Sequence, residues 1–157
     1  MAKTAREEAQ KNIAENRKAF HDFHILETYE AGVALLGTEV KSIREGNVNL
    51  RDSFARLESG EVWIYNVHIR AYSNRGYSDH EPTRKRKLLL HRTEIRKLIG
   101  KTVEKGMTLV PVRMYLKNGR VKIAISLAKG KKAHDKRETI KRRETDRETR
   151  AAVKERR

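Results

Sequence analysis

The residue types in this chain that could do chemistry are mainly cations, and they gather in two places. Residues 130–157 hold twelve Lys or Arg against six Asp or Glu. A second run holds Arg84, Lys85, Arg86 and Lys87. Both side chains bind phosphate oxygens, and Arg does so through paired hydrogen bonds. The pattern indicates binding of a polyanion rather than making or breaking of bonds.

Catalytic and metal-binding patterns are missing from the sequence. The chain has no cysteine, and its six histidines form no HExxH or other ligand spacing. No glycine-rich phosphate loop occurs. Glu30 and Glu39 could in principle be paired carboxylates, but nothing in the sequence brings them together, and Glu39 suits the positive end of a helix. We therefore expect no enzymatic activity, no metal and no cofactor.

The formal net charge is +16, and residues 130–157 supply only six of those charges. A field of this size attracts nucleic acid regardless of its sequence. An anionic membrane surface is the rival partner, but it needs an amphipathic apolar face or a lipid, and neither is visible. No apolar run suits a secretory signal or a membrane span. With no cysteine, we expect a cytoplasmic protein with a polyanionic partner and no membrane association.

Residues 130–157 contain too little apolar surface to form a core, so we expect them to be disordered in isolation. No helix breaker follows Gly130, and pairs such as Glu138 with Arg142 have helical ion-pair spacing. The segment is therefore expected to become helical on a polyanion. The alternative is a solvated charged tail with no partner.

The elements that must position these cations are predominantly predicted strands. Residues 1–18 are polar and are expected to be a flexible arm. A β-prone stretch begins at Phe20, with a bend expected at 30–32, and a short helix is expected over 38–46. Residues 53–69 resemble a hairpin in which Trp63 and Tyr65 share the core face with Val67 and Ile69.

A second helix is expected near 91–99, ended by Gly100. The strongest local signal is the final hairpin, in which alternating apolar residues flank Asn118 and Gly119. About six short antiparallel strands with two or three helices most easily bury their inner faces by closing into a small barrel of the oligonucleotide-binding type. An open α+β sheet is the second choice. The expected organisation is an arm (1–18), a barrel (19–129) and a basic tail (130–157).

The basic loop at 84–87 permits two interpretations, a solvated loop or a patch that grips phosphates beside the barrel. The net charge favours the second. Exposed aromatic residues are expected to be scarce, because Trp63 and Tyr65 alternate as core residues do. The pattern therefore favours recognition of a folded RNA by shape and backbone over stacking of unpaired bases.

Several motifs resemble the SsrA-binding protein family, also called small protein B. They are EAG at 30–32, GTEVKS at 37–42, PTRKRKLLL at 82–90, AKGKK at 128–132 and HDKR at 134–137. The similarity covers about residues 16–145. It implies an oligonucleotide-binding-type barrel that binds the tRNA-like domain of transfer-messenger RNA (tmRNA, or SsrA RNA) in bacterial rescue of stalled ribosomes.

The resemblance also assigns residues. It implies RNA binding at Glu30, Leu89 and His91. With the basic patch, the candidate RNA contacts further include Arg84, Lys85, Arg86, Lys87, Lys122 and Lys129. Gly130 would be a pivot between barrel and tail. The tail residues expected near the ribosomal decoding centre are Lys131, Lys132, His134, Asp135, Lys136, Arg137, Lys141, Arg142 and Arg143.

The implied mechanism has the barrel occupy the place of the anticodon arm that the tRNA-like domain lacks. The tail would then enter an mRNA channel left empty by a truncated message and become helical there. Expected partners are tmRNA, one protein per RNA, and the ribosome, with the tmRNA charged by alanyl-tRNA synthetase and accompanied by elongation factor Tu. A structural ribosomal protein with a basic extension is the alternative.

Overall fold

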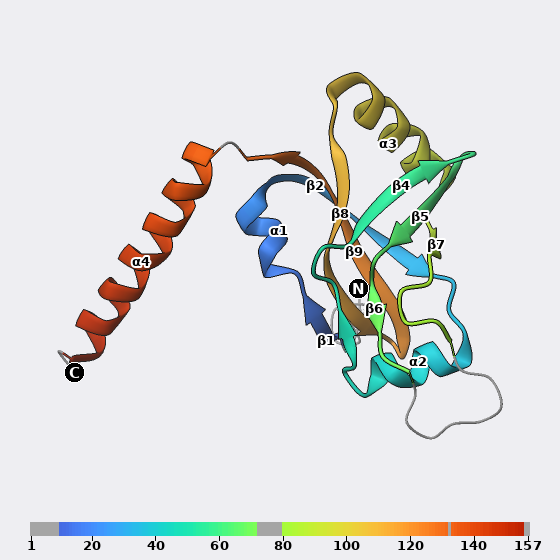
Figure 1. Ribbon diagram of the computed structural model, residues 1–157, viewed down its shortest axis with the longest axis horizontal. Coiled ribbons are helices and arrows are strands. Elements are labelled where there is room, and N and C mark those ends of the chain that lie inside the picture. Colours follow the sequence, from blue (N-terminus) through green and yellow to red (C-terminus); the bar gives the residue numbers. More distant parts are fainter. Residues whose placement is uncertain (1–9, 72–79, 132, 156–157) are drawn as a thin grey trace, which may run out of the picture.

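The computed structural model describes residues 10–71, 80–131 and 133–155 of the chain (Figure 1). The helices are α1 (Arg17–Asp22), α2 (Gly37–Arg44), α3 (Arg92–Lys105) and α4 (Ala133–Glu155). The strands are β1 (Gln10–Glu15), β2 (Phe23–Val33), β3 (Val48–Asn49), β4 (Phe54–Glu58), β5 (Glu61–Tyr65), β6 (His68–Ile69), β7 (Arg86–Leu89), β8 (Thr108–Lys117) and β9 (Arg120–Gly130).

Six of these strands close into a ring, which confirms the predicted small antiparallel barrel. The hydrogen-bonded order is β8-β4-β5-β7-β2-β9, and a further pairing of β9 with β8 completes the circuit. β1 adds to β8 outside the ring, and β3 pairs with β6 in a separate two-stranded sheet. The only residue pair between β4 and β8 is Ala55 opposite Leu109, so this is the shortest strand pairing in the ring.

The longest pairing is the predicted hairpin of β8 and β9. Its two turn residues, Asn118 and Gly119, have φ of 52° and 77°. Two consecutive left-handed residues twist the turn in the sense that the flanking strands require, and Asn and Gly tolerate this conformation best. The turn thereby fixes the register, with Lys117 opposite Arg120 and Tyr115 opposite Lys122.

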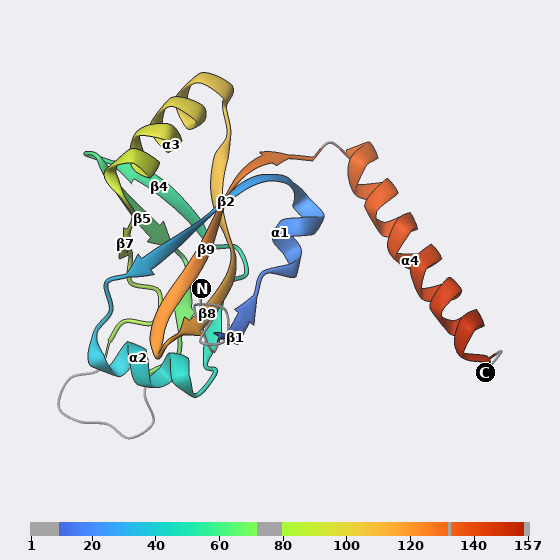
Figure 2. The ribbon, with the colours of Figure 1, turned by 180° about the vertical axis from the view of Figure 1, so that it is seen from behind.

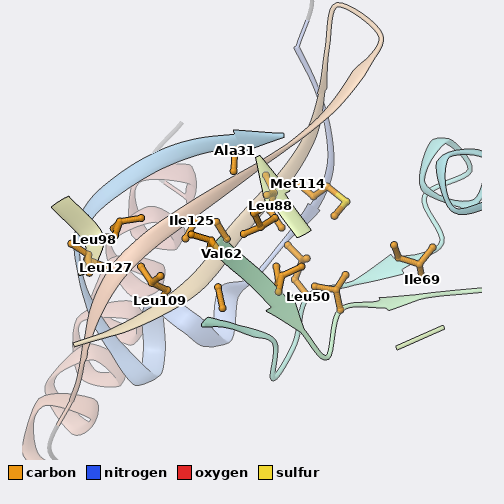
Figure 3. Close-up of a cluster of buried hydrophobic side chains, with 14 of the residues drawn as sticks. Ala31, Leu50, Val62, Ile69, Leu88, Leu98, Leu109, Met114, Ile125 and Leu127 are labelled. Atoms are coloured by element: carbon orange, nitrogen blue, oxygen red, sulfur yellow. The ribbon is translucent and has the colours of Figure 1, made fainter. Parts of the chain in front are cut away.

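The main apolar core contains side chains from every strand of the ring and from the helices α2 and α3 (Figure 3). Leu88, Leu127 and Met114 are each 1% exposed, and Leu98 of α3 is fully buried at one end. Each such side chain contributes about 1.5–3 kcal/mol relative to exposure in water. The inward residues predicted for β9 are confirmed as members of this cluster, and they are Val121, Ile123, Ile125 and Leu127.

The hairpin of β4 and β5 reverses one prediction. Val62 and Ile64 lie in the core, whereas Trp63 and Tyr65 point outward and are half-buried. Val67 and Ile69 are buried as predicted. The alternation changes phase at Asn66, whose φ is 63°, because a left-handed residue between β5 and β6 breaks the extended period of two.

β8 contains a similar change of phase. Its register with β9 shifts between Pro111 and Arg113. Val110 and Val112, predicted to face the interior with Met114, instead join a second apolar cluster on the outer side, which includes Ala19 of α1. A bulge of this kind moves one part of a strand to the opposite face of the sheet.

Three predicted boundaries were wrong. Residues 10–15 form β1 and Asn16 caps α1, so the N-terminal arm does not extend to Lys18; residues 1–9 lie outside the described residues. β2 runs straight through 30–32, where a bend was predicted, because β9 pairs along it. α3 continues through Gly100 and ends at Gly106, whose φ is 61°.

α4 projects away from the barrel, and α1 lies on the side facing it (Figures 1 and 2). Lys131 ties the junction to α1 through its backbone N–H, which donates to the Asp22 carbonyl at 2.9 Å, and its Nζ, which donates to the Phe20 carbonyl at 3.0 Å. The Lys136 ammonium lies 3.6 Å from the Asp22 carboxylate. The helical form predicted for the bound tail is thus the form in the structure. Its disorder in isolation stays a prediction.

Candidate nucleic-acid interface

The outer face of the barrel carries a row of residues across four strands. Leu89 of β7 lies opposite Gly32 of β2, and Gly32 lies opposite Lys122 of β9. Lys122 in turn lies opposite Tyr115 of β8. Residues directly opposite each other in a sheet point to the same side, so this row forms one surface. Glu30, two residues before Gly32, shares it.

Because Gly32 has no side chain, the Leu89 side chain of the neighbouring strand can lie close to its backbone at the centre of this surface. A Cβ atom at this position would lie 3.3 Å from the Leu89 Cβ. Leu89 is 53% exposed although it is large and apolar. A shallow groove of about 340 Å³ adjoins both residues, and it is lined also by Arg120 and Lys122. An apolar contact between cations is suited to the ribose of a polynucleotide whose phosphates the cations bind.

Glu30 is held in this surface by two donors. The Tyr115 hydroxyl donates to one carboxylate oxygen at 2.5 Å, and the Lys117 ammonium donates to the other at 3.2 Å. The Tyr115 hydrogen bond lowers the pKa of Glu30 despite some desolvation, with help from Lys117 and the charge of Lys122. Burial and the Glu30 carboxylate raise the pKa of Tyr115 to about 12.

At neutral pH Glu30 is therefore an anion and Tyr115 a neutral donor. A carboxylate on an RNA-binding surface repels phosphate, so we assign Glu30 a positioning role rather than a phosphate contact. It fixes the Tyr115 ring, over which the Arg113 guanidinium lies at 4.4 Å from the centroid. It also holds the Lys117 ammonium at the edge of the row. Two cations and an aromatic ring are thereby ordered before any ligand binds.

His91 directly precedes the first residue of α3 and is separated from the end of β7 by Leu90. Its backbone N–H donates to the Glu94 carboxylate at 3.2 Å, which closes the first turn of the helix. The imidazole is exposed. α3 therefore starts three residues after Leu89. Of the family-implied residues, Glu30 and Leu89 share the outer face of the paired strands β2 and β7, and His91 lies at the start of α3.

The basic run at 84–87 divides between two tasks. Lys85 and Lys87 point outward, where their ammonium groups pair with Glu58 at 3.6 Å and Glu61 at 3.1 Å. Arg86 is 1% exposed, so the prediction that it contacts RNA was wrong. Its guanidinium donates to the carbonyls of Val67 at 2.9 Å and Pro82 at 3.1 Å.

Arg84 and Arg86 share a carboxylate inside the protein. Both donate to Glu39, which is fully buried at the start of α2, and the Arg84 bond measures 2.6 Å. Burial is the largest influence on the pKa of Glu39 and raises it, but the hydrogen bonds from Arg84, the Leu36 N–H and Arg86 together lower it overall. Arg84 and Arg86 thus fasten the basic loop to α2, and Lys85 and Lys87 carry its outward charge.

The remaining candidates lie toward the tail. Lys129 is exposed at the end of β9, opposite His24 of β2, and Gly130 is the last residue of that strand. Lys132 lies outside the described residues. His134 and Asp135 belong to the first turn of α4, but their side chains are not described. Among the predicted tail contacts, Arg137, Lys141, Arg142 and Arg143 are exposed on α4.

A family model described as SmpB protein matches residues 13–155. The SsrA-binding protein of Carboxydothermus hydrogenoformans is 60% identical over 147 residues, covering 94% of this chain and 99% of that protein. The chain belongs to the SmpB family. The SsrA-binding protein of Trichodesmium erythraeum is also 60% identical, over 149 residues, with 94% and 96% covered.

A solved structure described as "tmRNA-SmpB: a journey to the center of the bacterial ribosome" is also similar to this SmpB-family chain. The two are 54% identical and superpose with a TM-score of 0.64, covering 76% of this chain and 85% of that one. The SmpB family is an RNA-binding family, and these matches favour the SsrA-binding prediction over a structural ribosomal protein.

The sequence reasoning missed Tyr115, Lys117 and Gly32 as parts of this SmpB-family surface. The hairpin turn at 118–119 contained a usable signal for the first two, because it sets Tyr115 opposite Lys122 and leaves Lys117 beside the turn. The contact of Tyr115 and Lys117 with Glu30 depends on the pairing of β2 with β9. β2 lies far from the turn in the sequence. Gly32 was recognised only as part of a predicted bend and of the EAG motif.

Within the described residues there is no cluster of three or more metal-ligating side chains. No helix among them is long and apolar enough to span a membrane.

Proposed function

We propose that this protein binds the tRNA-like domain of SsrA RNA and delivers that RNA to stalled ribosomes for trans-translation. The observation that carries the proposal is the placement of Glu30 and Leu89 on one outer face of the barrel, in a chain 60% identical to SsrA-binding proteins over nearly its whole length. The solved tmRNA-SmpB structure supports the same partners, tmRNA and the bacterial ribosome. Action on the ribosome implies a cytoplasmic location.

The barrel grips the RNA by shape and backbone. Arg120 and Lys122 line the groove beside Leu89, Lys117 lies beside Glu30, and Lys87 extends the positive charge onto β7. These cations bind phosphates, while Glu30 keeps Tyr115 and Lys117 in place. The rigid barrel then stands where the tRNA-like domain lacks an anticodon arm, with one protein bound per RNA.

The tail leaves the barrel on the side opposite the proposed RNA-binding surface. α4 starts three residues after Gly130 and carries exposed cations along its length, so it can lie along a wall of phosphate without a core of its own. On a ribosome with a truncated message it occupies the empty mRNA channel beyond the decoding centre, and an intact message excludes it. Alanyl-tRNA synthetase and elongation factor Tu act on the tmRNA that this protein carries.

The test separates the barrel from the tail. Full-length protein and a variant ending at Gly130 are titrated with labelled tRNA-like RNA, and both are added to an in vitro tagging assay on ribosomes stalled on a truncated message. We expect affinities within about two-fold and tagging only with the full chain. Tagging by the truncated variant would reject the role of the tail. Binding of plain duplex as tight as that of the tRNA-like RNA would reject the role of the barrel.

A further inference from the structure

The outer face of β4 and β5 carries three aromatic rings beside the surface that contains Leu89. Phe54 and Tyr65 lie opposite each other in the hairpin and stack, with ring centroids 5.4 Å apart and an interplanar angle of 10°. Trp63, two residues before Tyr65, faces the same way and is half-buried. We call these residues, with Arg56 and Lys85, the aromatic patch.

Both cations of the patch lie over its rings. The Arg56 guanidinium carbon is 5.2 Å from the Phe54 centroid and 5.8 Å from that of Tyr65. The Lys85 ammonium is 4.7 Å from the Trp63 centroid and 5.9 Å from that of Tyr65. Exposed cation–π contacts of this kind are weak, about 0.5–1 kcal/mol, so a stronger partner can displace or share them.

One carboxylate organises the patch. Glu58 accepts a hydrogen bond from the Tyr65 hydroxyl and pairs with the Lys85 ammonium at 3.6 Å. It thereby orients Tyr65 and keeps Lys85 above the rings. Arg56, which belongs to β4, is exposed. Apolar packing alone does not need two cations held over outward-facing rings.

The patch continues into the surface already described. Trp63 lies opposite Lys87 of β7, and Leu89 is two residues further along the same strand and on the same face. An RNA held at Leu89 and Lys122 therefore passes close to the rings. Unpaired bases stack on aromatic side chains and on the planar guanidinium of Arg, while neighbouring cations bind their phosphates.

Resting on the function proposed above, we propose that the aromatic patch is a stacking site for an unpaired nucleotide of the bound RNA. The base stacks on the face formed by Trp63, Tyr65 and the Arg56 guanidinium, and Lys85 moves from the rings to the adjoining phosphate. The site adds recognition of an unstacked base to the shape recognition expected of the barrel. A protein partner with acidic residues is the competing occupant.

The chain itself contains the probe, because Trp63 is its only tryptophan. Intrinsic fluorescence of the full-length protein is followed while it is titrated with tRNA-like RNA, with a blunt-ended RNA duplex of two separate strands, or with poly-glutamate. Binding of each ligand is measured separately by anisotropy of a labelled copy. We expect the tRNA-like RNA to quench Trp63 in parallel with binding, and the other two ligands to bind without comparable quenching.

Variants distinguish a loss of stacking on the rings from a loss of folding stability. Phe54→Leu and Tyr65→Leu should each lower affinity for the tRNA-like RNA about ten-fold, whereas Trp63→Phe should retain it and Trp63→Leu should not. Tyr29→Leu is the matched control, because Tyr29 packs on the inner side of β2. It should lower the melting temperature as much as the patch variants and leave affinity unchanged. Lys85→Gln should reduce the salt slope by about one.

The outcomes separate this inference from the proposed function. If the tRNA-like RNA binds without quenching Trp63, or if the Leu variants bind it as tightly as wild type, the stacking site is rejected and the function stands. Equal quenching by the blunt-ended duplex or by poly-glutamate also rejects it, since neither offers an unpaired base. Failure of the RNA to bind rejects both.

Discussion

Glu39 and Arg86 form an ion pair sealed inside the protein, with the carboxylate fully buried and the guanidinium 1% exposed. The pair joins α2 to β7, and the neighbouring Arg84 donates to the same carboxylate. Arg84 and Arg86 therefore anchor the basic run at 84–87, and Lys85 and Lys87 lie on the protein surface. A charged sequence run of uniform appearance thus alternates between side chains that anchor it inside the protein and side chains on the surface.

Removing the charge of Glu39 should destabilise the protein severely. Glu39→Gln leaves Arg86 buried without a counter-charge, and loss of one partner from a buried pair typically costs about 3–5 kcal/mol. Urea denaturation followed by circular dichroism measures the change. Glu45→Gln, at the exposed end of the same helix, is the control and should change stability by less than about 0.5 kcal/mol. A Glu39→Gln variant as stable as wild type would contradict a structural role for the pair.

The same pair predicts how stability depends on pH. The pKa of Glu39 is lower in the folded protein than its ordinary value of 4.5, so the unfolded chain binds the proton more readily. The stabilisation by Glu39 is complete above that ordinary value and is lost as the pH falls through the lower folded value. Denaturation curves collected from neutral pH downward should show this loss in wild type and a shallower one in Glu39→Gln. Parallel curves for the two proteins would count against it.

A methyl group at position 32 should disturb RNA binding more than folding. Gly32→Ala places a Cβ 3.3 Å from the Leu89 Cβ, and the exposed Leu89 side chain can shift outward by a few tenths of an ångström. We expect a small change in melting temperature and a several-fold loss of affinity for the tRNA-like RNA. Gly37→Ala, where an added Cβ meets nothing within 4 Å, is the matched control. Equal affinities of the two variants would show that the Leu89 position does not matter.

Glu30 should act through the residues that it holds. Glu30→Gln can still accept from Tyr115, whereas Glu30→Ala releases both Tyr115 and Lys117. If Glu30 is a positioning residue, Glu30→Ala and Tyr115→Phe each weaken RNA binding, and the double variant is no weaker than the poorer single one. Anisotropy titrations in one buffer measure this cycle. Additive losses would mean that the two residues act independently. An increase in affinity in Glu30→Ala would mean that its charge only repels the RNA.

Isolated residues 131–157 should lack stable structure. The Ile140 side chain is 43% exposed in α4, and the side chains of this helix that the structure describes form no apolar face that could pack. Far-ultraviolet circular dichroism of the peptide should show mostly coil, with helix appearing on addition of a structured RNA. A peptide that is fully helical in dilute salt without RNA would contradict folding on the phosphate surface.

The sequence alone determined the features that depend on local chemistry. Asn118 and Gly119 predict their turn because few other residues accept two left-handed conformations in succession. The excess of cations predicts a polyanionic partner, and motifs spread over the chain predict the family. The alternation in β9 predicts its inner face because the strand has no irregularity there.

Only the tertiary structure decided which of the two apolar faces of a strand turns inward and which cations are exposed on the surface. Both faces of β5 are apolar, so its pairing with β7 and the left-handed Asn66 select Val62 and Ile64 for the core and leave Trp63 and Tyr65 outside. Arg86 and Lys87 are adjacent and chemically alike in the sequence. The strand period places one against Glu39 and the other in solvent, and that placement depends on the distant helix α2.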